Sequence, residues 1–232
     1  MRERHGLAPD MRQAIELAKA ATLSRKRTEA SDEIRSERGA RCEAALGVLV
    51  QLPTWAQRCP WDALVDKLDV VLCQQADHWG MGSPNLVILA PTGAGKTRTL
   101  SAIVRRLLRI GARNGGPAWD FASGIVVSHA AELALARRNH PLGRGEAPEV
   151  TQAIEASLLV VDDLGWDRDP TTLRDILEQR YRRNRPLIAA SGMTKPELTV
   201  HYGAAVLRRI RERDGQKEPP IDLHPKQEPE PQ

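Results

Sequence analysis

Apolar residues along the chain fall into short continuous runs separated by longer amphipathic stretches. Four runs are short enough to be buried strands: LVIL, GIVVS, LLVV and PLIAA, at 86–89, 124–128, 158–161 and 186–190. Between them, apolar residues recur three and four positions apart, which is typical of helices with one buried face. This alternation predicts an α/β fold in which a parallel sheet lies between two layers of helices.

Helix boundaries follow from the same spacing. Asp169 or Thr171 can cap one of the helices, because their side chains accept hydrogen bonds from free backbone N–H groups. We expect the first helix to pack on the sheet domain just before the first strand. The predicted helices are 61–79, one directly after Thr97, 130–138, 149–156, 172–184, 195–202 and 204–213, with a short last strand at 221–223.

Composition suggests three regions. Residues 1–82 form a helical N-terminal region, 83–224 the sheet domain, and 225–232 a disordered tail rich in Pro, Glu and Gln. The polar stretch 24–41 has no apolar stripe, so it is either an exposed, hinge-like or partly disordered segment or an arm that docks a partner.

Bulk properties limit the function classes. The chain has 232 residues, a net charge of +4 and a pI near 9.2, which permits nucleic-acid binding without requiring it. Only 3% of the residues are aromatic, so no base-stacking surface is evident. No membrane span, signal-peptide core or paired cysteine framework is present in the sequence, and we expect a cytoplasmic protein with reduced thiols.

The most informative stretch is LVILAPTGAGKT, at 86–97. An apolar strand leads into a glycine-bearing turn and then a Lys-Thr pair, which is the P-loop (Walker A) pattern that surrounds nucleotide phosphates. Lys96 would reach the β- and γ-phosphates and Thr97 would hold Mg²⁺. Ala90 replaces the first glycine of the pattern, and its methyl is small enough to be tolerated. The predicted ATP-binding residues are Ala90, Pro91, Thr92, Gly93, Ala94, Gly95, Lys96, Thr97 and Arg98.

A second motif, LLVVDDLG at 158–165, completes this chemistry. Four apolar residues form a strand buried on both faces, and two carboxylates follow at its carboxyl end, where α/β sheets bind ligands. Asp162 would hold the Mg²⁺ shell together with Thr97, and Asp163 would orient the attacking water. Because Asp162 follows Lys96 by 66 residues with one strand between them, the two motifs read as one Walker A and Walker B pair.

Taken together, the motifs resemble a known family. The segment VVDDLGWDRDPTTLRDILEQRYRRNRPLIAASGMTKPEL, within a likeness running from Leu86 to Arg213, resembles AAA+ ATPases of the helicase-loader group, the DnaC-like and IstB-like proteins. The residues that fit the family pattern are Asp162, Asp163, Leu164, Gly165, Arg180 and Tyr181.

The resemblance implies a three-layer P-loop NTPase of the AAA+ type, with a helical N-terminal extension and no evident C-terminal lid. It implies an ATPase that loads a replicative helicase or assists a transposase, acting on single- or double-stranded DNA as a homo-oligomer when ATP is bound. Arg209 aligns with the family's arginine finger, which acts on the ATP of a neighbouring subunit, and Arg208 is the alternative. The implied catalytic residues are therefore Lys96, Asp163 and Arg209.

One departure bears on the rate of hydrolysis. The family's sensor 1 Asn aligns with Gly192, which has no side chain, while Ser191 would point to the other side of the strand. Slow hydrolysis is therefore expected, and a nucleotide-gated adaptor that hardly hydrolyses ATP remains an alternative. A small-molecule kinase shares the P-loop but needs a substrate lid that is not evident. The arginines suggested to contact DNA are Arg105, Arg106, Arg182 and Arg183.

Overall fold

Five short parallel strands form the centre of the computed structural model, which describes residues 33, 36–37, 39–59, 61–114, 124–213 and 215–225. The chain divides into two units, Met1–Glu43 and Ala44–Gln232, and the sheet belongs to the second. Across the sheet the strand order is β2 (Ile125–His129), β3 (Leu158–Asp162), β4 (Leu187–Ser191), β1 (Leu86–Leu89) and β7 (Ile221–Asp222). All four pairings are parallel, as the continuous apolar runs predict.

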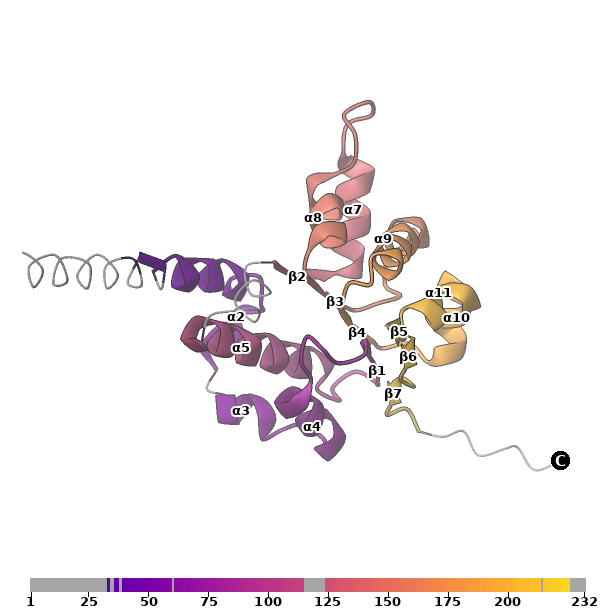
Figure 1. The fold of residues 1–232 in the computed structure, drawn as a ribbon. Coiled ribbons are helices and arrows are strands. Elements are labelled where there is room, and N and C mark those ends of the chain that lie inside the picture. Colours follow the sequence, from indigo (N-terminus) through magenta and orange to yellow (C-terminus); the bar gives the residue numbers. More distant parts are fainter. Residues whose placement is uncertain are drawn as a thin grey trace, which may run out of the picture. The chain divides into compact units, whose positions relative to one another are not determined.

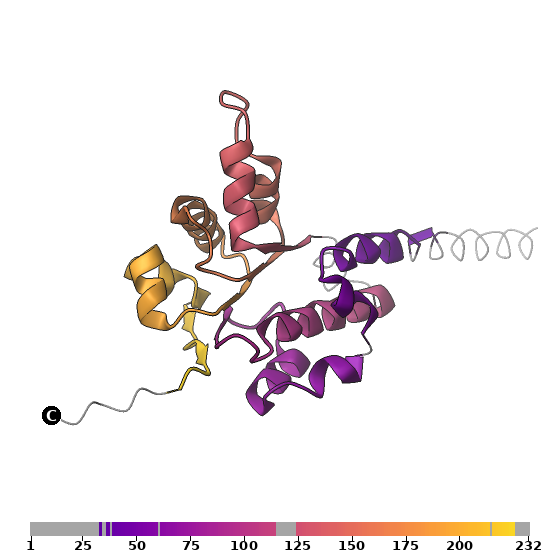
Figure 2. The same ribbon diagram turned by 180° about the vertical axis from the view of Figure 1, so that it is seen from behind.

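The buried strands divide their side chains between two cores. Ile88, Val160 and Ile188 pack into one core, and Val87 and Leu89 belong to the other, because successive residues of a strand point to opposite faces. Helices therefore cover both faces of the sheet (Figures 1 and 2). This confirms the predicted three-layer α/β fold. The first face carries α2 (Thr54–Arg58), α3 (Trp61–Val65), α4 (Val70–His78) and α5 (Lys96–Asn114), and the second α7 (Ala130–Asn139), α8 (Pro148–Glu155), α9 (Pro170–Arg182), α10 (Lys195–Tyr202) and α11 (Ala204–Arg209).

Arginines of α5 tie the first helical layer together. Arg105 donates to the carbonyls of Ala56 and Cys59, at the end of α2, and Arg106 donates to Ala76 and Trp79, at the end of α4. The last carbonyls of a helix have no partner within the helix, so a cation there satisfies them and complements the helix dipole. These contacts hold both half-buried guanidinium groups against the ends of α2 and α4, and the suggestion that they contact DNA stays a prediction.

Two predicted helices end earlier than their apolar spacing suggests. The stretch 61–79 is divided between α3 and α4, because the Asp69 carboxylate accepts a hydrogen bond from the Val71 N–H and starts a new helix. The helix predicted to reach residue 213 ends at Arg209. The chain then forms a hairpin of β5 (Glu212–Arg213) and β6 (Gln216–Lys217), with Gly215 at a φ of 73° in its turn.

The remaining boundaries agree with the sequence to within about two residues. Asp169, one of the two predicted caps, accepts a hydrogen bond from the Thr171 N–H at the start of α9. Residues 44–82, assigned from composition to an N-terminal region, share a core with α5 and β1 through Leu52, Leu64 and Leu72. Among the described helices, none is both long and apolar enough to cross a lipid bilayer.

Candidate phosphate-binding site

Both sequence motifs meet at one edge of the sheet, as the parallel topology requires. Leu89 at the end of β1 pairs with Ser191 at the end of β4, and β3 lies on the other side of β4. Backbone hydrogen bonds extend this arrangement beyond the strands: the Ala90 N–H donates to the Ser191 carbonyl at 3.1 Å, and the Leu164 N–H donates to the Ala190 carbonyl at 2.8 Å. The phosphate loop follows β1 and the Asp-Asp pair follows β3, so the two motifs lie at the same edge of the sheet on either side of β4.

The loop has the backbone that a phosphate cradle needs. Gly93 and Gly95 have φ values of 88° and 94°, a region that residues with a side chain rarely adopt. A Cβ at Gly95 would lie 2.8 Å from a terminal methyl of Leu68, which would have to move, and the positive φ disfavours any residue with a side chain. Pro91, Thr92 and Gly93 are exposed at the rim, whereas Ala94 is half-buried. The loop thus combines an open rim with a closely packed base.

The position of the Ala90 side chain explains why alanine can replace the first glycine of the motif. Its side chain is fully buried and belongs to the core between β1 and the α2–α5 layer. The methyl therefore faces away from the phosphates, into apolar packing.

Lys96 is the cation at the base of the loop. It is only 8% exposed, and its ammonium donates to the carbonyls of Ala90, at 2.7 Å, and Pro91, at 3.0 Å. None of the ion pairs among the described residues includes Lys96, so its charge is met by neutral carbonyls alone. A buried ammonium in this setting favours an anion, and a phosphate oxygen could replace the two carbonyls.

Thr97 and Asp162 lie in direct contact, as the predicted metal site requires. The Thr97 hydroxyl donates to Oδ2 of Asp162 at 2.5 Å, and Oδ1 of Asp162 accepts from the Asp163 N–H at 2.9 Å. Burial raises the pKa of Asp162, an effect that the Thr97 hydrogen bond opposes. A hydroxyl and a carboxylate are oxygen ligands of the kind Mg²⁺ prefers, so these two residues fit a magnesium site.

Asp163 points away from that pair. Its φ is 52°, a left-handed conformation that Asp tolerates better than most residues, and its side chain is 51% exposed. Its Oδ2 lies 3.5 Å from Nδ1 of His129, at the end of β2, and His129 pairs with Asp162 in the sheet register. An exposed carboxylate held beside an imidazole is available to bind and orient water.

Ser191 ends β4 and Gly192 follows it, next to the phosphate loop. The Ser191 hydroxyl is buried, donates to the Leu164 carbonyl at 2.5 Å and accepts from the Met193 N–H at 3.0 Å, so it supports the loop after β3. A Cβ built on Gly192 would lie 3.9 Å from the Lys96 ammonium nitrogen. Position 192 therefore faces the site, and Ser191 does not replace its missing side chain.

Two predicted arginines contact other parts of the chain. Arg98 donates to the Ala63 carbonyl at 2.8 Å, and its guanidinium lies 5.0 Å from the centre of the Trp55 ring. Arg209 forms an ion pair with Glu178 of α9 and lies 5.7 Å from the Tyr181 ring, whereas Arg208 is exposed. The structure therefore brings together Ala90–Thr97, Asp162 and Asp163, and holds the side chains of Arg98 and Arg209 in other contacts.

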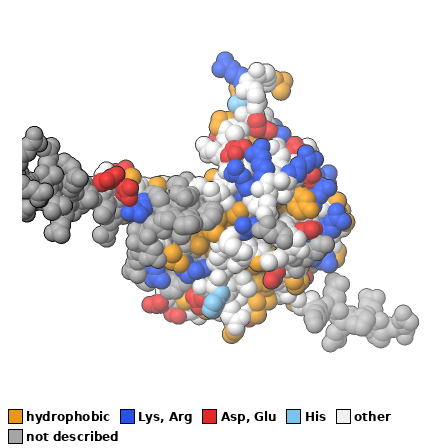
Figure 3. All heavy atoms as spheres, viewed as in Figure 1, with side chains coloured by type: hydrophobic (Ala, Val, Ile, Leu, Met, Phe, Trp, Pro, Cys, Tyr) orange, Lys and Arg blue, Asp and Glu red, His pale blue; other side chains and the backbone are white. Residues whose placement is uncertain are grey.

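Four arginines at or just after the end of α9 and on α11 share two glutamates, Glu178 and Glu155. Arg182 pairs with Glu178 at 3.1 Å, and both Arg183 and Arg185 pair with Glu155. Blue and red side chains are correspondingly interleaved in the region of Figure 3 where Figure 1 places α9 and α11. The local charge is therefore mixed, and the structure does not single out Arg182 or Arg183 as a phosphate-binding pair.

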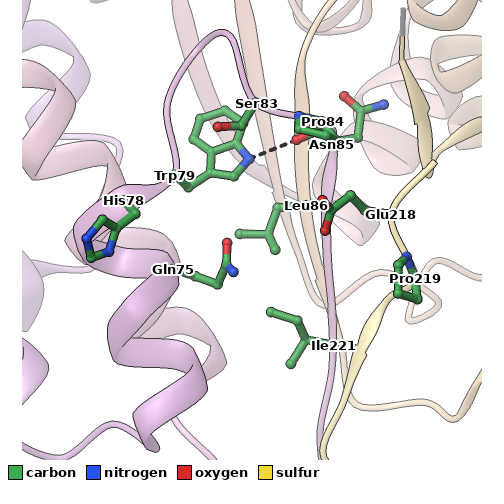
Figure 4. Close-up of a pocket in the computed structure, with 10 residues that line it drawn as sticks. All are labelled: Gln75, His78, Trp79, Ser83, Pro84, Asn85, Leu86, Glu218, Pro219 and Ile221. Carbon is green, nitrogen blue, oxygen red and sulfur yellow. Dashed lines mark hydrogen bonds between the residues drawn. The ribbon is translucent and has the colours of Figure 1, made fainter. Parts of the chain in front are cut away.

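A separate cavity of about 220 Å³ lies at the amino end of β1, between α4 and the β6–β7 connection (Figure 4). Much of its polar lining is already hydrogen-bonded: the Trp79 indole donates to the Pro84 carbonyl at 2.9 Å, and the Ser83 hydroxyl accepts from the Gly80 N–H. The Asn85 amide oxygen accepts from the Leu187 N–H. Its residues lie at the end of the sheet opposite the phosphate loop.

Sequence reasoning missed three residues at the site: His129, Trp166 and His224. His129 could have been found, because it follows an apolar strand that ends at the same edge as Asp162. Trp166 is 65% exposed beside Gly192, and Nε2 of His224 lies 3.1 Å from the Gly192 carbonyl oxygen. These two placements depend on the path of the loop after β3 and on which side of β1 the predicted last strand pairs, and the sequence indicates neither.

No model of a known protein family matches the chain, and no curated protein sequence matches it. Solved structures are similar in part. DnaI matches with 21% identity and a TM-score of 0.47 over 66% of this chain and 90% of that one. AMPPCP-bound DnaA from Aquifex aeolicus matches with 21% identity and a TM-score of 0.45 over 60% and 42%. A proposed primosome component from Streptococcus pyogenes serotype M3 matches with 18% identity and a TM-score of 0.49 over 69% and 85%.

The chain resembles the AAA+ ATPases of the helicase-loader group. The resemblance lies in its own Walker A and Walker B segments, which the structure brings to one edge of a parallel sheet. At 18–21% identity, these structures do not establish the activity or the partners of this chain, which must be argued from its own residues.

Proposed function

We propose that this chain binds ATP with Mg²⁺, hydrolyses it, and acts in DNA replication as a helicase loader. The observation that carries the proposal is the contact at 2.5 Å between the Asp162 carboxylate and the hydroxyl of Thr97, the residue that follows Lys96 in the phosphate loop. A P-loop threonine in contact with the first Walker B aspartate is the pair that holds magnesium in P-loop NTPases. Chance glycines in a turn would not bring these two motifs together from a separation of 65 residues.

Each residue of the site has a distinct part in this proposal. Lys96 and the loop N–H groups bind the phosphates, helped by the positive end of α5, which begins at Lys96. Thr97 and Asp162 hold Mg²⁺, which supplies charge neutralisation at the β- and γ-phosphate oxygens when it is bound. Asp163, half-exposed and beside His129, orients a water molecule and accepts its proton.

The role in replication follows from the family resemblance, and a transposase helper remains the second candidate within it. Among the similar structures, one is named as a proposed primosome component, and that name fixes no partner for this chain. In the proposed function a replicative helicase and DNA are the partners, the region 1–82 docks the helicase, and the ATP-bound form is a homo-oligomer. Residues 1–32, part of that region, lie outside the described residues.

Arg209 is proposed to act on the ATP of a neighbouring subunit, with Arg208 as the alternative. In the isolated chain Arg209 is paired with Glu178, so this role requires the pair to open when subunits assemble. Mixing two inactive variants tests it. Lys96→Ala keeps the arginine and loses the site, whereas Arg209→Ala keeps the site and loses the arginine. Recovery of hydrolysis on mixing supports action between subunits, and no recovery contradicts it.

Phosphate release from ATP tests the proposed activity itself. The wild-type protein is expected to hydrolyse ATP with Mg²⁺, slowly because position 192 lacks a side chain, and Lys96→Ala is expected to lose this activity. Lys195→Ala is the matched control, because Lys195 is exposed at the start of α10. Hydrolysis that survives in Lys96→Ala would contradict the assignment of the site.

A nucleotide-gated adaptor is the second candidate function, and Gly192 is the observation that favours it. The space beside the Lys96 ammonium holds no side chain from position 192, so water positioning there depends on other groups. An adaptor would bind ATP with Mg²⁺ and release no phosphate, with or without single-stranded DNA, whereas an ATPase would release it. The two outcomes separate the candidates.

A further inference from the structure

Trp166 places a large aromatic side chain at the edge of the phosphate site. It follows the Walker B segment directly and is 65% exposed, although an exposed indole forgoes favourable burial. A Cβ built on Gly192 would lie 3.7 Å from Nε1 of Trp166 and 3.9 Å from the Lys96 ammonium nitrogen. The indole N–H and the ammonium therefore border the same small space, which a side chain at position 192 would enter.

The backbone on both sides of Trp166 is firmly held. The Gly165 N–H donates to the Tyr202 hydroxyl at 2.9 Å, and the Trp166 N–H donates to the Asp163 carbonyl at 3.1 Å. On the other side, the buried Asp167 carboxylate accepts a hydrogen bond from the Tyr202 hydroxyl. The backbone that carries the indole is thus held by Tyr202 of α10 and by the turn at Asp163, so its exposure does not result from a loosely attached loop.

The indole offers one chemical function at this place. Nε1–H is a hydrogen-bond donor and cannot accept, so its natural partner beside an ammonium is an oxygen with negative charge. No hydrogen bond between described residues uses Nε1 of Trp166, whereas the indole of Trp79 donates to the Pro84 carbonyl. The donor that faces position 192 is therefore available to a bound molecule.

We propose that Trp166 supplies, from the neighbouring loop, the hydrogen-bond donor that Gly192 lacks. In a site with an asparagine at 192, the amide would occupy the space between Lys96 and the indole. Here the glycine leaves that space open, and the Trp166 N–H donates to a γ-phosphate oxygen of ATP. The inference rests on the proposed function, because it requires ATP phosphates at Lys96.

This arrangement predicts a specific exchange between two positions. Trp166→Phe keeps the ring and removes the donor, so turnover is expected to fall about 10- to 100-fold, and the Kd for ATP is expected to rise by a smaller factor, because the hydrogen bond strengthens as charge develops on the γ-phosphoryl group. Adding Gly192→Asn to this variant puts an amide donor into the open space and is expected to recover at least about tenfold. Rescue by a residue of the loop after β4 would not be expected if Trp166 only supported the fold.

Fluorescence gives a readout that does not depend on turnover. A non-hydrolysable ATP analogue with Mg²⁺ is expected to change the tryptophan emission of the wild-type protein more than ADP does, because only the analogue carries a γ-phosphate. Trp166→Phe is expected to abolish this difference. Trp79→Phe is the matched control, since it removes an indole N–H at the opposite end of β1 and is expected to leave the difference intact.

Two kinds of failure can be told apart. If wild-type protein shows Mg²⁺-dependent ATP binding and Trp166→Phe matches it in turnover and in the fluorescence difference, the assignment of Trp166 is wrong and the proposed function stands. If wild-type protein binds no ATP, the proposed function fails together with this inference. If wild-type protein binds ATP without hydrolysing it, the fluorescence difference alone decides for or against Trp166.

Discussion

Two buried cations, Lys96 and Arg180, both donate hydrogen bonds to backbone carbonyls, but one lies beside an exposed loop and the other lies in the core. Lys96, at the phosphate loop, donates to the carbonyls of Ala90 and Pro91. Arg180, on α9, donates to four carbonyls, those of Ala153, Ile154, Ala156 and Pro186. Both are buried, and neither donates to a carboxylate.

The difference lies in what could replace those carbonyls. The rim beside Lys96 is exposed from Pro91 to Gly93, so a phosphate can reach the ammonium. Arg180 is 1% exposed and joins the end of α8 to β4, where no ligand can enter. Burial lowers the pKa of Arg180 to about 9, so it still carries its charge at neutral pH. The same chemistry therefore serves binding at an open rim and stability in a closed core.

Replacing Arg180 should give the largest effect on stability. Arg180→Met removes the donor for four buried carbonyls, and the free energy of unfolding is expected to fall by about 3–5 kcal/mol. Chemical denaturation monitored by circular dichroism measures it. Arg182→Met is the matched control, because that side chain is 72% exposed and pairs only with Glu178. If Arg180→Met and Arg182→Met lowered the free energy of unfolding by the same small amount, the structural role assigned to Arg180 would be contradicted.

Replacing Lys96 should affect binding instead of stability. Lys96→Met removes a buried charge from an open rim, so the free energy of unfolding without nucleotide is expected to change by less than about 1 kcal/mol. The Kd for ATP is expected to rise about 10- to 100-fold, since a charged hydrogen bond is lost. Calorimetric titration and denaturation of the same variant give both values. A destabilisation as large as that of Arg180→Met would show that Lys96 is mainly structural.

The sequence predicted that the residues of the two motifs come together at one edge of the sheet, because its signals are local. Strand, glycine turn and Lys-Thr follow one another within twelve residues, and parallel topology then carries Asp162 to the same edge. The partners of the arginines were not predictable in this way. Arg105 and Arg106 face the ends of α2 and α4, which are separated from them by 27 to 49 residues.

The sequence also failed to predict where two helices end. Apolar spacing continues through Leu68 and cannot show that the Asp69 side chain starts a second helix. The spacing also continues past Arg209, where the chain forms a hairpin instead. The exposure of Trp166 could not be predicted either, because Tyr202, 36 residues further along the chain, holds the backbone beside it.

Arg106 lies between the two extremes and should have an intermediate effect. Its guanidinium is partly buried, which lowers its pKa, and it donates to the carbonyls of Ala76 and Trp79. Arg106→Met is expected to lower the free energy of unfolding by about 1–2 kcal/mol without changing the Kd for ATP. Weakened binding of single-stranded DNA with unchanged stability would instead support the sequence-based suggestion that it faces DNA.

Ala90→Gly should give the smallest effect. The change restores the usual glycine of the motif but removes a fully buried methyl, so stability is expected to fall by about 1 kcal/mol. ATP affinity should stay within about twofold, because the methyl faces the core. A marked gain in affinity would show that the methyl obstructs the phosphates.

The central claim is that Lys96, Thr97, Asp162 and Asp163 form one site for ATP and Mg²⁺. Titration of the purified protein with ATP, with and without Mg²⁺, tests it most directly, using Thr97→Val and Asp162→Asn beside the wild type. The account predicts that wild-type affinity falls about tenfold or more when Mg²⁺ is removed, and that both variants lose most of this dependence. Wild-type protein without Mg²⁺-dependent affinity for ATP would contradict it.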